Sequence, residues 1–150
     1  MPSSYTCLYY HLIFSTKERR PLIAAEWQTR LYDYMGGIIS HEKGRLLAAG
    51  GTTDHVHLLA SLTALKAVSD LLRLVKANSS KWLHETFAEH REFRWQDGYG
   101  AFSVSFSNLA QVKRYIAEQQ QHHCRMSFQE EFLALLQRHG VTYDERYIWK

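Results

Sequence analysis

The segment RLLAAGGTTDHVHLLASL, residues 45–62, holds two apolar runs separated by a short turn sequence. The runs 45–50 and 54–62 have the length of strands, and the Gly-Thr-Thr sequence between them is typical of a turn. We therefore expect two neighbouring strands at this point of the chain, and the second of them carries the most informative polar residues.

Periodic patterns on both sides of these strands extend the fold. The aromatic and β-branched segment 5–15 predicts a buried strand, and the alternating segment 101–106 predicts another. Apolar residues at spacings of three and four predict helices. These helices cover residues 24–41, 66–87 and 108–122, and a fourth begins at Ser127, where Ser127 and Glu130 form a capping box.

The predicted order is thus β-α-β-β-α-β-α-α. Its first six elements match the ferredoxin-like (RRM-like) split βαβ arrangement, an antiparallel sheet with two helices on one face. We therefore expect an α+β fold of this type, with additional C-terminal helices. This fold class alone implies no function, because many unrelated proteins use it.

Composition limits the classes of protein that remain. The 150 residues fit a single domain spanning 1–150, and the net charge of +3 permits a polyanionic partner. Two cysteines without CxxC spacing support neither a disulfide framework nor a structural zinc site. There is no signal-like N-terminal segment and no run of eighteen apolar residues, so we expect a cytoplasmic protein with no membrane partner.

His55 and His57 are candidate metal ligands. Because side chains alternate along a strand, the two histidines share one face while Val56 and Leu58 share the other. Two imidazoles at this spacing, on a strand packed through its other face, can hold one divalent cation. The alternative is that they line a polar sheet face without binding anything.

Tyr115 is a candidate nucleophile on the predicted helix 108–122. A phenol has a pKa of about 10 and attacks poorly at neutral pH, but a neighbouring cation stabilises the phenolate. Gln119 follows four residues later, on the same helical face, and its amide oxygen suits a hard cation. Lys113 and Arg114 precede the tyrosine and could contact phosphates. The alternative is a tyrosine that simply packs against the sheet.

The chain resembles the IS200-like single-tyrosine transposases, which carry a His-hydrophobe-His (HUH) motif, including the REP-associated tyrosine transposases. The resemblance extends over most of the sequence and rests on several motifs in the same order. They are YHLIFSTKERRP (10–21), GGTTDHVHLL (50–59), DLLRLVKANSSKW (70–82), WQDGYGAFSVS (95–105), VKRYIAEQQQHH (112–123) and SFQEEFLALL (127–136).

The resemblance implies a specific chemistry. His55 and His57 match the metal-binding pair, Tyr115 matches the nucleophile, and Gln119 falls where many members have a polar metal ligand. Such enzymes use Mg²⁺ or Mn²⁺ to cut single-stranded DNA at hairpin or palindromic ends. The tyrosine becomes linked to a 5′-phosphate, a 3′-hydroxyl is released, and strands are rejoined without ATP. Insertion-sequence members act as homodimers in which the tyrosine helix completes the partner's site, and the sequence leaves this point open.

Basic residues elsewhere are further candidates for DNA contacts, although each could equally belong to a solvated surface. Those predicted to contact phosphates are Lys17, Arg19 and Arg20 in the loop after the first strand, and Lys76 and Lys81 on the helix 66–87. Three other histidines, His11, His122 and His123, are expected to be structural.

Three other functions fit parts of the pattern. A non-catalytic nucleic-acid-binding module would bind without cleaving, although no RNP1-like run is present. A metal-dependent phosphoesterase using activated water would cleave without a covalent adduct. A domesticated REP-associated transposase would act on chromosomal palindromes with the same chemistry.

Overall fold

The computed structural model describes residues 3–150, and its centre is a four-stranded antiparallel sheet. The strand order is β2-β3-β1-β4, with β3 and β1 in the middle. This confirms the predicted ferredoxin-like arrangement. The strands are β1 (Tyr9–Ser15), β2 (Arg45–Gly51), β3 (His55–Ser61) and β4 (Gly100–Val104).

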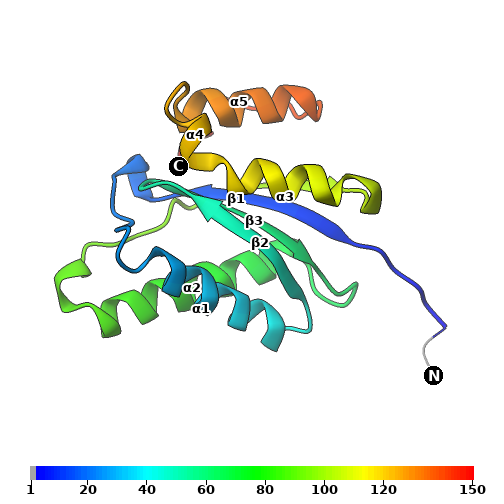
Figure 1. The fold of residues 1–150 in the computed structure, drawn as a ribbon, viewed down its shortest axis with the longest axis horizontal. Helices are drawn as coiled ribbons and strands as arrows, with labels where there is room; N and C mark the ends of the chain where they lie inside the picture. The colour runs from blue at the N-terminus through cyan, green and yellow to red at the C-terminus, as the bar shows by residue number, and fades with distance from the viewer. Residues whose placement is uncertain (1–2) are drawn as a thin grey trace.

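Helices cover both faces of the sheet (Figure 1). On one face lie α1 (Gln28–His41) and α2 (Val68–Thr86), as the split βαβ order predicts. On the other lie α3 (Leu109–Ala117), α4 (Gln119–His122) and α5 (Phe128–Arg138). Short 3-10 turns, Lys17–Arg19, Ala88–His90 and Phe106–Asn108, occur in the connections. The sheet face that carries the histidines is therefore covered by the C-terminal helices.

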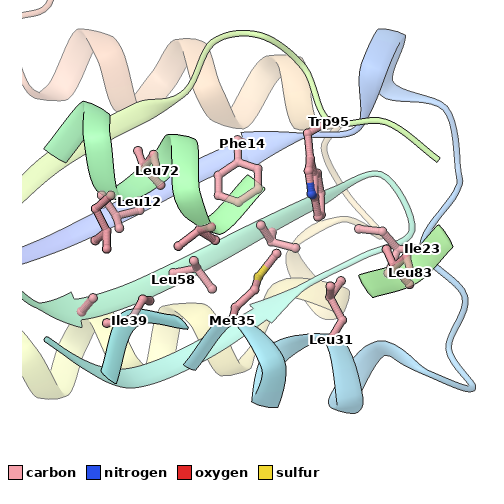
Figure 2. Close-up of a cluster of buried hydrophobic side chains, with 14 of the residues drawn as sticks. Leu12, Phe14, Ile23, Leu31, Met35, Ile39, Leu58, Leu72, Leu83 and Trp95 are labelled. Carbon is pink, nitrogen blue, oxygen red and sulfur yellow. The ribbon is translucent and has the colours of Figure 1, made fainter. Parts of the chain in front are cut away.

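The main apolar core fills the space between the sheet and α1 and α2 (Figure 2). Alternate residues of β1 and β3 supply it from the sheet, among them Leu12, Phe14 and Leu58. Met35 of α1 and Leu72 of α2 pack onto them from the helices. Their burial removes apolar surface from water and holds this face of the sheet rigid.

A smaller apolar cluster holds α5 against the opposite face. Ile13 of β1 and Phe102 of β4 contact the apolar stripe of α5, which consists of Phe128, Phe132, Leu135 and Leu136. The helix begins as predicted, because the Ser127 hydroxyl accepts a hydrogen bond from the backbone N–H of Glu130 at 3.2 Å. This cluster fixes the segment that closes over the histidines.

The end of β2 lies unusually close to α3. A methyl group at Gly50 would lie 2.3 Å from the backbone oxygen of Ile116, so only glycine admits the helix at this distance. Ile116 follows Tyr115 directly, and the glycine therefore sets how near the tyrosine comes to the sheet.

Several expected boundaries differ in the structure, and one of them is the start of the first helix, which is Gln28 and not residue 24. The first strand begins at Tyr9 and not at residue 5, and the Leu8 carbonyl just before it accepts a hydrogen bond from the backbone N–H of Leu62 at 2.9 Å. The expected helix 108–122 is interrupted at Glu118, whose φ of −98° and ψ of 18° separate α3 from α4. Among residues 3–150, no helix is both long and apolar enough to cross a membrane.

Candidate active site under the C-terminal helices

His55 and His57 are fully buried and face the same side, as predicted. The Nδ1 atom of each imidazole lies within hydrogen-bond distance of a neighbouring side chain. Asp54 Oδ1 lies 2.7 Å from Nδ1 of His55, and His11 Nε2 lies 2.7 Å from Nδ1 of His57. Such partners fix the ring orientation of metal-binding histidines. Both Nε2 atoms are thereby directed toward the helices above.

Gln119 reaches this pair from the first turn of α4. Its Oε1 lies 3.0 Å from Nε2 of His55, and its side chain is almost completely buried. The helix break at Glu118 does not separate Gln119 from Tyr115, because both side chains contact the same carboxylate, that of Glu131. The predicted residues Tyr115, Gln119, His55 and His57 therefore come together in one site.

Glu131 lies at the centre of the site and is not among the residues predicted from the sequence. Its Oε1 lies 2.9 Å from Nε2 of His57, 3.0 Å from Nε2 of His123 and 3.6 Å from Nε2 of His55. Its Oε2 accepts hydrogen bonds from the Tyr115 hydroxyl and, at 3.0 Å, from the Gln119 amide. The residue is only 1% exposed, which is unusual for a carboxylate.

A sequence signal for Glu131 exists. The residue falls within the apolar stripe of α5, between Phe128, Phe132 and Leu135 at helical spacing, and not on the polar face. His123, which was expected to be structural, also belongs to the site through its bond to Glu131. His11 was expected to be a packed core histidine; it is buried, and it also orients His57.

The environment shifts the pKa values of these groups in opposite directions. Burial lowers the pKa of His57 to about 4, against the opposing effect of Glu131, so its imidazole is neutral at neutral pH. Burial alone would raise the pKa of the Glu131 carboxyl, but hydrogen bonds from His123 and His57 outweigh it, and the net pKa is lowered. Burial also opposes the charged form of His123, yet the bond to Glu131 raises its pKa overall.

Tyr115 lies beside the histidines of its own chain. Its ring contacts His57 edge-on, with 5.8 Å between ring centroids, and stacks on His122 at 4.7 Å. Burial is the main cause that raises the pKa of the Tyr115 phenol, and the Glu131 carboxylate raises it further. The phenol is therefore protonated at neutral pH. A cavity of about 350 Å³ opens next to the ring, and its walls include His11, Phe102 and Arg138. The phenol is thus accessible from one side and fixed on the other.

The donor set fits a divalent cation. One ligand atom from each of His55, His57, His123 and Glu131 lies within 4.8 Å of the others. Two ligands of one ion at 2.0–2.2 Å are separated by at most about 4.4 Å, so small side-chain movements suffice. Gln119 offers an amide oxygen at the edge of the same group.

The basic residues predicted to contact DNA do not form one surface. Lys113 and Arg114 are exposed on α3, next to Tyr115. Lys76 instead donates to the backbone oxygens of Gln96 (3.0 Å), Asp97 (3.3 Å) and Gly98, and burial lowers its pKa to about 8. Lys76 therefore tethers the loop before β4.

The remaining basic residues have local partners. Lys17 lines a cavity of about 560 Å³ together with Lys76 and lies 3.8 Å from Asp97. Arg19 lies over the ring of Trp149, Arg20 pairs with Glu92 at 3.2 Å, and Lys81 lies 3.9 Å from Glu85.

Comparison of the chain with known proteins places it first in a class, the transposases, and then in one family of that class. The model of the IS200-like transposase family matches residues 4–119, and the chain belongs to this family. Membership implies an enzyme that cleaves and transfers DNA.

Relatives agree with this assignment. The chain is 28% identical over 117 residues to the ISDra2 transposase TnpA of Deinococcus radiodurans, covering 75% of this chain and 84% of that protein. It is 29% identical over 116 residues to the transposase for insertion sequence element IS200 of Salmonella typhimurium, covering 73% and 75%.

Two solved structures share the fold. A crystal structure described as a transposase from Deinococcus radiodurans R1 superposes with a TM-score of 0.64 at 27% identity, covering 79% of this chain and 95% of that one. The structure of a REP-associated tyrosine transposase bound to a REP hairpin gives a TM-score of 0.60 at 14% identity, covering 82% and 73%.

Proposed function

We propose that the protein cuts and rejoins single-stranded DNA at hairpin or palindromic ends, with Tyr115 as nucleophile and with a divalent cation, Mg²⁺ or Mn²⁺, at His55, His57 and Gln119. The observation that carries the proposal is the position of the Tyr115 hydroxyl, which bonds to the same carboxylate as His57 and Gln119. The convergence of nucleophile and candidate ligands from a single chain supports a site completed by the chain's own tyrosine helix.

Tyr115 would attack the phosphorus of the target strand. The bond between its phenolic oxygen and phosphorus forms, the bond between phosphorus and the 3′-oxygen breaks, and the phenolic proton ends on the released 3′-hydroxyl. Glu131 and the stacked ring of His122 fix the direction of the phenol, and such fixed orientation is a large part of catalysis in group transfer. Reversal of the step by another 3′-hydroxyl rejoins strands.

A bound cation would supply positive charge that stabilises the phenolate and the charge developing on the phosphate. The chain's own residues provide the rest of the environment. The cavity beside Tyr115 contains Arg138, and Lys113 and Arg114 lie on the tyrosine helix, so phosphates of an entering strand would meet positive charge there. A hairpin substrate is supported by the relative whose structure contains a REP hairpin.

The test uses the full-length protein with single-stranded oligonucleotides taken from hairpins that flank its gene, in Mn²⁺ or Mg²⁺. Each oligonucleotide is labelled either at its 3′ end or at its 5′ end. Because the tyrosine keeps the 5′-phosphate, the 3′ label should travel with the protein in denaturing gels and the 5′ label should be released. Tyr115→Phe should abolish the adduct, whereas Tyr147→Phe, at an exposed tyrosine, should not.

The other outcomes identify the rival functions. Cleavage without an adduct, unchanged in Tyr115→Phe, would indicate a water-using phosphoesterase. Binding without cleavage, indifferent to EDTA, would indicate a non-catalytic module. Mixing two chains, Tyr115→Phe and His57→Ala, separates the dimer arrangements. Activity restored by mixing would mean that the tyrosine acts on a partner's site, against the arrangement proposed.

A further inference from the structure

His123 and Glu131 extend the predicted ligand set with residues from the segment after Gln119. The family model matches residues 4–119, so both lie outside the matched part of the chain. They are brought to the histidine pair by α4 and by the apolar stripe of α5. This C-terminal segment therefore contributes to the site itself and does not only cover it.

The directions of the donor atoms favour one shared centre. Nε2 of His57 and Nε2 of His123 lie 2.9 Å and 3.0 Å from the same oxygen, Oε1 of Glu131, and Nε2 of His55 lies 3.6 Å from it. Asp54 and His11 hold the other ring nitrogen of His55 and His57. Three imidazoles thus present their Nε2 atoms around one carboxylate oxygen. Structural packing alone does not require this convergence.

The chemistry of this set differs from that of a magnesium site. Mg²⁺ prefers six oxygen ligands and usually retains several waters, whereas imidazole nitrogens favour first-row transition metals. Of the four ligand residues here, three offer an imidazole nitrogen and only Glu131 offers oxygen. These side chains are almost completely buried, apart from partly exposed His123, and Mg²⁺ gives up its waters reluctantly.

We propose that His55, His57, His123 and Glu131 form a three-histidine, one-carboxylate centre that binds a first-row transition-metal ion in preference to Mg²⁺. Gln119 lies at the edge of this centre, where its amide contacts both His55 and Glu131. The inference rests on the proposed function for the role of the site, but it concerns metal binding in the absence of DNA. It identifies two ligands, from beyond the family-matched region, that a site of His55, His57 and Gln119 does not include.

The test measures metal binding by the full chain without DNA. Equilibrium dialysis with Zn²⁺, Co²⁺, Mn²⁺ and Mg²⁺, followed by elemental analysis, gives the affinities, and the visible absorption of Co²⁺ reports the ligand field. We expect one Co²⁺ or Zn²⁺ per chain, bound at least about 100-fold more tightly than Mg²⁺. Glu131→Gln and His123→Ala should each weaken Co²⁺ binding by at least about 100-fold, because losing even an outer partner costs about 10- to 100-fold.

The matched control is Glu130→Gln, the neighbouring carboxylate on the same helix, which should leave binding and the Co²⁺ spectrum unchanged. Circular dichroism and the thermal midpoint of the metal-free variants establish that each is folded. Glu131→Asp, which retains a carboxylate, should bind Co²⁺ with a shifted spectrum even if α5 packs less well. Wild-type protein that binds Mg²⁺ as tightly as Co²⁺ would overturn the inference.

Folded Glu131→Gln and His123→Ala proteins with wild-type affinity would also overturn it, while leaving the proposed Tyr115 chemistry intact. Conversely, tight Co²⁺ binding by a protein that forms no DNA adduct would support the centre and refute the proposed function. The two proposals therefore fail separately.

Discussion

The two faces of the sheet are built for different tasks, although both are buried. The face under α1 and α2 is filled mainly by apolar side chains, and its polar contacts are few, such as the bond that Trp95 donates to buried Ser79 at 3.0 Å. The face under α3, α4 and α5 buries His55, His57, Gln119 and Glu131. Apolar burial is favourable wherever it occurs, whereas buried polar groups are tolerated only when each is paired. One face therefore holds the fold together, and the other holds the polar groups of the candidate site in a fixed arrangement that the first face supports.

Substitutions at two neighbouring residues of β3 test this division between the faces most strongly. His57 points to the face under α3, α4 and α5, and Leu58 points to the face under α1 and α2. We expect His57→Ala to lower the yield of covalent DNA adduct by at least about 100-fold, since losing even an outer-shell partner of a metal costs about 10- to 100-fold. The yield is measured with labelled hairpin DNA under denaturing conditions. An adduct yield close to wild type would remove His57 from the reactive face.

Leu58→Ala should show the opposite behaviour. Removing a fully buried leucine from the main core should lower the free energy of unfolding by about 2–5 kcal/mol, measured by urea denaturation. Adduct yield per folded molecule should stay near that of the wild type. A selective loss of the reaction without a loss of stability would mean that the two faces are not separable.

Gly50→Ala tests whether the approach of α3 positions the tyrosine. The added methyl group would meet the Ile116 backbone oxygen, so we expect a loss of about 1–3 kcal/mol by urea denaturation, together with a reduced adduct rate. Gly37→Ala is the matched control, because nothing lies within 4 Å of a methyl group there. It should stabilise α1 by about 0.5–1 kcal/mol and leave the adduct rate unchanged.

The smallest expected effect is on DNA binding, when one lysine on either side of the sheet is replaced by alanine. Lys113→Ala, on the tyrosine helix, should reduce the salt dependence of single-stranded DNA binding by about 0.7 in the log–log slope, the effect of one phosphate contact. Lys81→Ala, on α2 across the sheet, should leave the slope unchanged. Fluorescence anisotropy at several salt concentrations measures both. Equal effects of the two substitutions would place DNA on both faces.

The order of elements could be predicted from the sequence because periodicity is a local property. The runs around His55 and the stripes of the two long helices were sufficient for the sheet and for α1 and α2. The interruption at Glu118 was not predictable, because the residues on both sides continue a helical pattern. Tyr115 and Gln119, on either side of the interruption, both contact Glu131, a residue of a different helix.

The candidate site could be predicted only in part. His55, His57, Tyr115 and Gln119 were identified from spacing and from resemblance, and the structure brings them together. Glu131 was not predicted, because the acidic residue with a recognisable local pattern at the start of α5 is its neighbour Glu130, which belongs to the capping box. Its function depends on how α5 docks on Ile13 and Phe102, and this contact between distant segments leaves only a weak trace in the sequence.

The central claim is that Tyr115 attacks DNA from its place beside the histidines. The most direct test is mass spectrometry of the protein after reaction with hairpin DNA, nuclease trimming and tryptic digestion. Cleavage after Arg114 and Arg125 releases the peptide YIAEQQQHHCR, residues 115–125, which holds only one tyrosine. We predict a 5′-phosphonucleotide on Tyr115 in this peptide. Unmodified peptide together with a nucleotide on another tyrosine, or on no residue at all, would contradict the account.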